Sequence, residues 1–426
     1  MLKKHTWPLA ALMLWWIGTL LPAGAQGLNI TSETIIRAME RDTAGGNHQT
    51  VLPIYEFFSV DLADDDEEKA DGFSLHLYGW GRTDMAAGDY YEDDPDGELI
   101  YGYINYSMDS DALQSRLGRQ HIWSGVANES IDGFSFTYGL GKYLSLMLFG
   151  GLPAEFGEQN GMAGDVTYGG RMAALFWPAY ELGVSFQQLQ DDKRLLEKKA
   201  GIDFNLQSGD WGIFSGLSSF NLTNDTWREH RYDLSLFLSD FQLEPSYQYF
   251  FYQDYFDQSD SRMNLFHFLQ DSDETLSIYG TDLLYSSFPE FQMGVRGRQY
   301  DYKLRDENAK YLSWLMVLKS IGGSQFGAEI GHMDGETADN LYDLFRCYLH
   351  WQDPLQIHLL EFISADALLV NYDEPIYDKE RSVQFSLGAG RKFWGEFMET
   401  RFSVIYSNDP YFEDDFSGVG TLQINY

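Results

Sequence analysis

Charged side chains recur at every second position along several segments of this chain. Arg296 and Arg298, for example, alternate with Val295 and Gly297. Because successive side chains of a β-strand point to opposite faces, both arginines should lie on one face of a strand. The same pattern puts other arginines and carboxylates on the polar face of their own segments. The candidate residues of this polar face are Arg82, Asp203, Arg231, Asp233, Glu244, Gln292, Arg296, Arg298, Glu329, Glu399 and Arg401.

Rows of arginine facing rows of carboxylate have two uses in a protein wall. If the wall encloses a water-filled pore, the rows create a transverse field and select solutes by charge. Alternatively, the side chains form ion pairs that stiffen the wall. The sequence leaves both alternatives open, and the second does not exclude conduction.

Patterns typical of enzymes and metal sites are absent from the sequence. It holds no Gly-x-Ser-x-Gly and no His-Glu-x-x-His. A single cysteine, Cys347, excludes a disulfide framework, a cysteine-rich zinc site and a Cys-x-x-Cys-His haem attachment within the chain. Glu92, Asp94 and Asp96 match three calcium-loop positions, but the twelfth position is Tyr103. We therefore expect a solvated acidic loop, no catalytic residue, no metal and no cofactor.

The elements that would position the charged residues are short alternating segments, which follow one another from Val51 onward. In one of them Phe241, Leu243 and Tyr247 face one way and Gln242 and Glu244 face the other. About ten residues per segment, separated by turn residues, is the signature of a membrane barrel. A soluble sandwich would also alternate.

Loop lengths favour the barrel over the sandwich. Short and long connections tend to alternate, as expected for short periplasmic turns and longer external loops. The short ones lie near residues 393–395, 352–354, 321–323, 286–289, 239–241, 208–210 and 177–179. The longer polar ones lie near residues 408–415, 371–380, 253–273, 190–198, 152–164 and 84–97.

The predicted fold is therefore all-β, a transmembrane antiparallel β-barrel of about 20 strands, with a range of 18–22. It would occupy residues 51–426. The segment Val51 to Leu62 adds one strand to the count and breaks the even parity of such barrels. A barrel of this size encloses a wet or plugged lumen, because its own side chains cannot fill it.

The N-terminal residues predict export. Lys3 and Lys4 precede an apolar run, and Ala23-Gly24-Ala25 has the form of a signal-peptidase site. We expect a signal peptide over residues 1–25, the alternative being a membrane anchor. Residues 26–50 would form a separate short segment with a small capped helix, lying in the periplasm or plugging the lumen.

The C-terminus and the composition agree with an outer-membrane location. Leu422, Ile424 and Tyr426 share one face of the last segment and resemble the terminal signal that barrel-assembly machinery reads. Aromatic residues make up 16% of the chain, which suits interfacial girdles. The formal net charge of −36 argues against nucleic acid as a partner. Outer-membrane lipid and the assembly machinery are the expected partners.

Three segments carry a family resemblance. They are the stretch from Ser115 to Gly133, with its Leu-Gly-Arg-Gln and Ile-Asp-Gly elements, and the segments 53–57 and 78–82. Together they resemble outer-membrane porin-like barrels of metal-reducing deltaproteobacteria, which are components of porin–cytochrome conduits. The resemblance implies a periplasmic multihaem cytochrome partner and supplies no haem ligand in this chain.

Two functions remain open at this stage, and neither is enzymatic. A diffusion porin would pass small hydrophilic solutes and would fold an external loop inward, with residues 253–273 or 152–164 as candidates. An insulating sheath for a cytochrome would instead bind its partner through residues 26–50 and the lumen wall, for extracellular electron transfer.

Overall fold

The structure is a computed structural model in which most of the chain is described. The described residues are 27–42, 48–63, 72–86, 90–91, 93–108, 112–154, 165–176, 179–191, 194–252, 274–304, 307–320, 322–354, 360–395, 397–410 and 414–426. The expected signal peptide and the expected inward loop at 253–273 lie outside them, as does most of the loop at 152–164.

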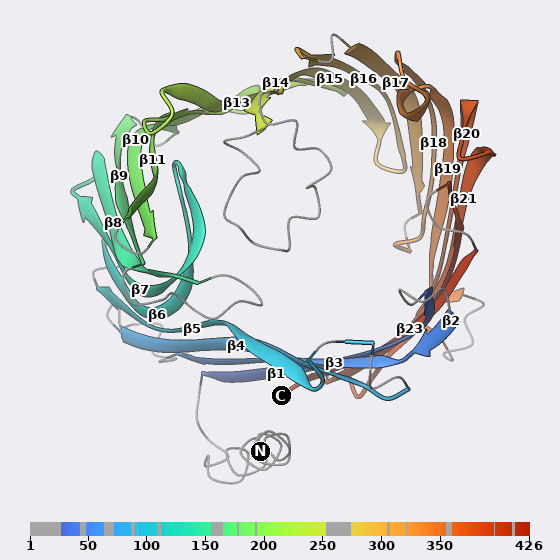
Figure 1. The fold of residues 1–426 in the computed structure, drawn as a ribbon, viewed down its shortest axis with the longest axis horizontal. Helices are drawn as coiled ribbons and strands as arrows, with labels where there is room; N and C mark the ends of the chain where they lie inside the picture. Colours follow the sequence, from blue (N-terminus) through green and yellow to red (C-terminus); the bar gives the residue numbers. More distant parts are fainter. Residues whose placement is uncertain are drawn as a thin grey trace.

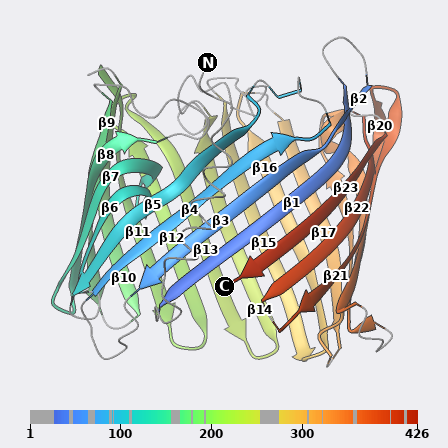
Figure 2. The same ribbon diagram turned by 90° about the horizontal axis from the view of Figure 1, so that it is seen from below.

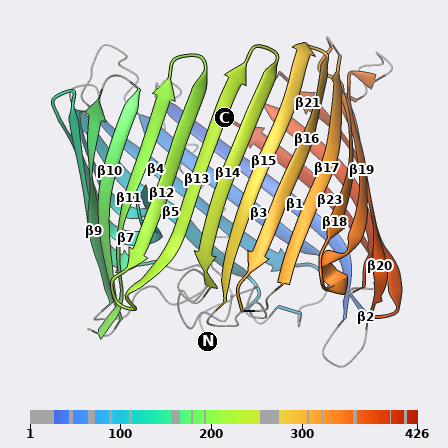
Figure 3. The same ribbon diagram turned by 90° about the horizontal axis from the view of Figure 1, so that it is seen from above.

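The described residues form one closed antiparallel barrel of 22 strands (Figure 1). Each strand pairs with its neighbours in chain order, and β23 pairs with β1 to close the ring. The strands are strongly tilted relative to the barrel axis (Figures 2 and 3). Their bounds are β1 (Leu28–Asp42), β3 (Pro53–Ala63), β4 (Gly72–Asp84), β5 (Asp96–Met108), β6 (Leu113–Ser124), β7 (Ala127–Leu140), β8 (Leu144–Pro153), β9 (Val166–Phe176), β10 (Tyr180–Asp191), β11 (Arg194–Ser208), β12 (Gly212–Asn221), β13 (Thr226–Leu238), β14 (Phe241–Phe251), β15 (Thr275–Phe288), β16 (Phe291–Tyr302), β17 (Glu307–Lys319), β18 (Gln325–Asp334), β19 (Tyr342–Gln352), β20 (Phe362–Ile376), β21 (Lys379–Phe393), β22 (Met398–Asn408) and β23 (Asp415–Asn425).

Two short elements lie outside this ring of strands. Strand β2 (His48–Val51) pairs with the end of β1, and the 3-10 helix η2 (Ala338–Asn340) precedes β19. In the described part of the chain, no helix has the length and apolar character needed to cross a membrane. The all-β antiparallel barrel is thus confirmed, with 22 ring strands at the upper limit of the expected range.

The expectation for residues 26–50 is wrong. Residues 28–42 are a barrel strand, β1, and form neither a helix nor a separate segment. Ile35 and Ile36 suggested a helical stripe, but β-branched residues also favour strands. Strand β1 is paired along its length with β3 on one side and β23 on the other. It therefore supplies the strand that restores even parity, and the barrel begins before Val51.

Two of the expected long loops are also shorter than predicted. Strands β20 and β21 continue through residues 371–380 and are joined at Tyr377 and Asp378, whose φ angles are 47° and 64°. Positive φ at both central residues is the geometry of a two-residue hairpin turn. Strands β10 and β11 likewise extend to Asp191 and from Arg194. These polar residues belong to the strands, because backbone pairing with the neighbouring strand, and not side-chain hydropathy, determines where each strand ends.

The wall has two chemically distinct faces. One row of register partners crosses seven strands through apolar residues alone. This row is Leu283, Val295, Trp314, Ile330, Phe345, Leu369 and Val383. The first five are 41–49% exposed, far more than a packed core allows. Such a continuous exposed apolar surface calls for a nonpolar environment around the barrel.

The inner face is identified by the hairpin of β6 and β7, whose turn lies inside the ring (Figure 1). The backbone N–H of Val126 in this turn donates to Ser185 Oγ at 3.0 Å. Ser185 and its neighbours two residues away therefore point inward. Since residues that pair across strands share a face, the register carries this assignment around the barrel.

Candidate functional site: the inner wall

All eleven candidate residues lie on the face that the register makes the inner one. Strand pairs such as Glu244 with Asp282, and Asp282 with Arg296, link them from strand to strand. The same connection runs from Arg401 through Thr421, Ile35 and Tyr55 to Arg82. That these residues line a conducting pore remains a prediction.

A network of charges covers the inner face of β15–β20, which we call the charged sector. It consists of Asp282, Arg296, Arg298, Glu329, Arg346 and Asp366. Asp282 accepts from Arg296 Nε at 3.2 Å and from Arg298 Nη1 at 2.6 Å. Arg296 also lies 3.8 Å from Glu329, and Arg346 lies 2.9 Å from Asp366. Arg296, Arg298 and Glu329, which were predicted separately, are thus linked by ion pairs that span β15 to β18.

Sequence reasoning missed three members of this sector, namely Asp282, Arg346 and Asp366. Each lies in an alternating segment, so strand periodicity could have placed it on the polar face. What the sequence does not contain is the register, which sets Asp282 directly opposite Arg296. Other predicted residues lie beyond the sector. Arg401 pairs with Glu399 at 2.6 Å, and Glu244 accepts from Gln242 at 2.6 Å.

The β6–β7 hairpin covers another part of the inner wall. Ile122, Ala127 and Ile131 of the hairpin form a small buried core with Phe149 of β8. Gly125 in the turn has φ +58°, and a Cβ there would lie 2.4 Å from the Cβ of Ser185. Only glycine fits this close approach without displacement.

Buried polar groups fix the same hairpin to the wall. Thr167 of β9 donates to Glu129 of β7. Glu197 of β11 pairs with Lys199 at 3.2 Å and with Arg228 at 2.8 Å, and the side chains of Lys199 and Arg228 are 6% and 8% exposed. Because buried charges are costly unless they are paired, these ion pairs stabilise a single arrangement of the side chains in the cluster. Among the described residues, this hairpin folds inward, and it was not among the predicted candidates.

Aromatic side chains dominate the inner face of β3–β5. We call them the aromatic strip, namely Tyr55, Phe57, His76, Tyr78, Trp80, Tyr101 and Tyr103 with Tyr91 of the adjoining loop. The ring centroids of Tyr78 and Tyr101 are 5.4 Å apart, and those of Tyr103 and His76 are 5.0 Å apart. Sequence analysis assigned the aromatic residues to membrane interfaces and missed this inner cluster.

Two groups in connections have perturbed ionisation. The Tyr406 hydroxyl donates to Asp414 at 2.6 Å, and the Asn408 amide donates at 2.5 Å, which lowers the pKa of Asp414. Burial raises the pKa of Tyr91, whose hydroxyl is 3.5 Å from that of Tyr55. Neither group has the partners of a catalytic acid or base. Among the described residues, no group of three or more His, Cys, Asp or Glu side chains is placed to hold a metal.

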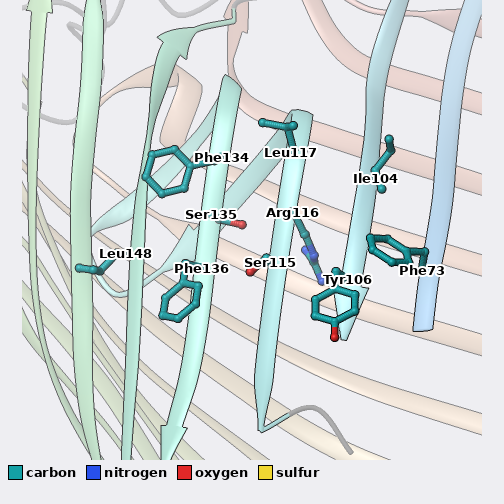
Figure 4. Close-up of a pocket in the computed structure, with 10 residues that line it drawn as sticks. All are labelled: Phe73, Ile104, Tyr106, Ser115, Arg116, Leu117, Phe134, Ser135, Phe136 and Leu148. Atoms are coloured by element: carbon teal, nitrogen blue, oxygen red, sulfur yellow. The ribbon is translucent and has the colours of Figure 1, made fainter. Parts of the chain in front are cut away.

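A shallow pocket lies on the outer face of β4–β8 (Figure 4). Its lining is mostly apolar, with Phe73, Ile104, Leu117, Phe134 and Leu148 projecting from neighbouring strands. These side chains continue the apolar outer surface. The pocket has the chemistry of a lipid contact, and Arg116 and Ser135 at its base are the polar residues that it shares with the inner face.

Comparisons with known proteins bear on the fold. No protein-family model and no curated protein sequence matches the chain. Among solved structures it is similar to the P pilus usher (PapC) translocation pore, with a TM-score of 0.52, 10% identity, and coverage of 93% of this chain and 99% of that chain. OpdQ of Pseudomonas aeruginosa gives a TM-score of 0.45 at 8% identity, covering 94% and 98%. OccAB4 of Acinetobacter baumannii gives 0.43 at 9%, covering 95% and 99%. The first of these likenesses supports the large closed barrel as the fold.

Proposed function

We propose that this protein is a channel of the Gram-negative outer membrane, through which small hydrophilic solutes pass passively. The observation that carries the proposal is the contrast between the two faces of one wall. Val295 belongs to an exposed apolar row, whereas the next residue, Arg296, contacts two carboxylates inside. Such a wall suits lipid outside and water inside. The usher pore to which the fold is similar is also a translocation pore by its description.

The termini fit the same location. Residues 1–25 would be removed as a signal peptide during export. On the last strand, Leu422 and Ile424 share the outer face, with Tyr426 following at the chain end. In this proposal these three residues form the signal through which the assembly machinery inserts the barrel.

The charged sector would set selectivity. Arg296 and Arg298 share Asp282, so each cation is held beside an acid and the side chains cannot swing freely into the lumen. Fixed charges of both signs on one stretch of wall give a local field that deflects mobile ions. Pairing also stiffens the wall, so the two alternatives raised by the sequence operate together.

The β6–β7 hairpin would act as the constriction of the channel. Twenty-two strands, spaced about 4.8 Å apart and tilted by about 40°, give a backbone ring about 44 Å across. A ring this wide discriminates poorly unless something narrows it. The hairpin is anchored by Val126 to Ser185 of β10 and by Glu129 to Thr167 of β9, so it lies inside the ring against the wall and takes up part of the lumen (Figure 1).

A sheath for a periplasmic multihaem cytochrome is the second candidate. The resemblance of the segments around Leu117–Gln120 motivates it, and the estimated width of the ring would admit a folded partner. In that case electrons would cross through the partner, as in a porin–cytochrome conduit. The barrel would then carry stoichiometric haem protein when purified gently.

Planar-bilayer recording on the mature chain tests the first proposal. We expect stable conductance steps from haem-free protein and a reversal potential in a salt gradient that depends on Arg296 and Arg298. An absence of conductance from correctly folded, haem-free barrel would contradict the channel. If the barrel, purified by pull-down in mild detergent, showed a stoichiometric haem absorbance, the result would favour the cytochrome sheath over the solute channel.

A further inference from the structure

We propose that the aromatic strip is a binding track for neutral oligosaccharides, an inference that rests on the channel function proposed above. Its rings occupy the inner face of β3–β5, away from the charged sector on β15–β20. All of them are half-buried, so each is held in place while part of it remains accessible. Fixed aromatic surface in a wet lumen is costly unless it serves a contact.

The rings form two groups that follow one another down the wall, because Trp80 of the first group is the register partner of Phe57 in the second. Tyr91 in the β4–β5 loop reaches Tyr55, whose ring is 6.5 Å from Trp80. Deeper in the barrel, Phe57 stacks with Tyr78 at 6.3 Å. The path continues through Tyr101 and Tyr103 to His76. Trp80 and His76 are four residues apart on β4, which corresponds to a length of about 13 Å along the strand.

Charged groups flank the strip, among them Glu33 opposite Phe57 and Arg116, whose guanidinium lies 5.3 Å from the centroid of the Tyr103 ring. Arg82 lies 3.4 Å from Asp96, and the guanidinium of Arg82 also lies over the Tyr91 ring at 3.8 Å. His76 contacts Asp61 at 2.7 Å. The surface that a solute would meet on the strip is nevertheless made mostly of uncharged rings, and contacts with aromatic rings require no charge on the solute. The chemistry therefore points to an uncharged solute.

Carbohydrate combines the two properties that this surface complements. The C–H faces of a pyranose ring are apolar and flat enough to lie on an aromatic ring, while its hydroxyl rim needs hydrogen-bond partners. Asp61 and Asp96 supply acceptors, because a carboxylate can accept several hydrogen bonds at once. The hydroxyls of Tyr78 and Tyr101 supply donors and acceptors. A linear oligosaccharide repeats the same face along its length, as the strip does.

Saturation-transfer NMR on the detergent-solubilised full barrel tests this directly. The probe is a linear glucose hexasaccharide, compared with polyethylene glycol of similar mass. Replacing two rings, Trp80→Leu with Tyr101→Leu, should weaken hexasaccharide binding about ten-fold or more, because stacking is lost while apolar bulk remains. Tyr348→Leu is the matched control, since Tyr348 is an inner-face tyrosine of β19 outside the strip. Circular dichroism checks folding, and Tyr101→Leu alone serves if the double variant fails to fold.

The outcomes separate this inference from the channel proposal. Hexasaccharide binding that is lost in the strip variants and kept in Tyr348→Leu supports the track, whether or not the barrel conducts. Equal signals from hexasaccharide and polyethylene glycol would overturn it, as would unchanged binding in the strip variants. A barrel that conducts but does not bind the hexasaccharide contradicts the track alone. Occupation of the strip by a co-purified protein that blocks the sugar would also count against it.

Discussion

The charged sector and the aromatic strip are two parts of the same inner wall with different chemistry. In the charged sector, Arg296 on β16 reaches Asp282 on the neighbouring strand β15 and Glu329 on β18, two strands away. In the strip, the rings of Tyr78 on β4 and Tyr101 on β5 lie side by side, with their centroids 5.4 Å apart. Both arise from the same alternation of side chains. The difference shows that one backbone architecture can carry a long-range field on one side and short-range contacts on the other.

These two kinds of interaction respond to different changes. Coulomb fields extend over about 10 Å at 0.1 M salt and about 3 Å at 1 M. Ring contacts act only at van der Waals distance and are insensitive to salt. Selectivity for ions and affinity for neutral solutes should therefore separate when either region is altered.

Charge reversal in the charged sector should give the largest effect. In Arg296→Glu with Arg298→Glu, the paired acids Asp282 and Glu329 are left among added carboxylates. We expect the cation-to-anion permeability ratio to rise about five-fold, because four units of negative charge are added to the wall. Reversal potentials in a salt gradient measure this. The ring variants Trp80→Leu with Tyr101→Leu should leave the ratio unchanged, and failure of the arginine variant to assemble would refute the inner placement.

Release of the hairpin should have the next largest effect, and it should act on both regions because the freed hairpin enters the lumen between them. Gly125→Val creates a clash with Ser185 and strains a positive φ. We expect single-channel conductance to fall about two-fold, since a hairpin that no longer seats against the wall occupies more of the lumen. Gly141→Val is the matched control, because Gly141 also has positive φ but no atom within 4 Å of the added Cβ. Equal effects of both changes would mean that strain, and not hairpin position, is responsible.

Raising the salt concentration separates the two regions without mutation. Between 0.1 M and 1 M salt, the departure of the permeability ratio from unity should fall by about half, because the field is screened. Binding of the glucose hexasaccharide should stay constant over the same range. A parallel loss of both properties would show that the strip also depends on charge.

Removal of a single acid should give the smallest change in the permeability ratio, and this change should be opposite in direction to that of the double arginine variant. Asp282→Asn leaves Arg296 and Arg298 without their shared carboxylate. The charge change is a quarter of that in the double arginine variant, so the permeability ratio should shift toward anions by about 1.5-fold. Bi-ionic recordings detect a change of this size. A shift toward cations would contradict the proposed role of this pair.

The periodicity of the sequence predicted the strands and the polar face well, because it is a local property. The register is not local, and neither are the contacts that depend on it. Asp282 meets Arg296 only because β15 and β16 pair as they do, and no residue near Asp282 in sequence encodes that alignment. The ion pairs could therefore not be read from alternation alone.

The two main misses have the same physical origin. Strand β1 contains Ile35, Ile36 and Met39, whose spacing also fits a helix, and its partner β23 lies at the far end of the chain. The inward hairpin depends on contact between Val126 and Ser185, which are 59 residues apart. In both cases a distant partner determined a local structure that the sequence periodicity did not predict.

Thiol accessibility at two adjacent residues tests the central claim, that this wall separates lipid from an aqueous lumen. The chain has one cysteine, so Cys347→Ser gives a cysteine-free background. In reconstituted barrels, a charged, membrane-impermeant thiol reagent should modify Arg296→Cys and change the current. The same reagent should leave Val295→Cys unmodified within the bilayer. Equal modification of both positions, or modification of position 295 alone, would contradict the account.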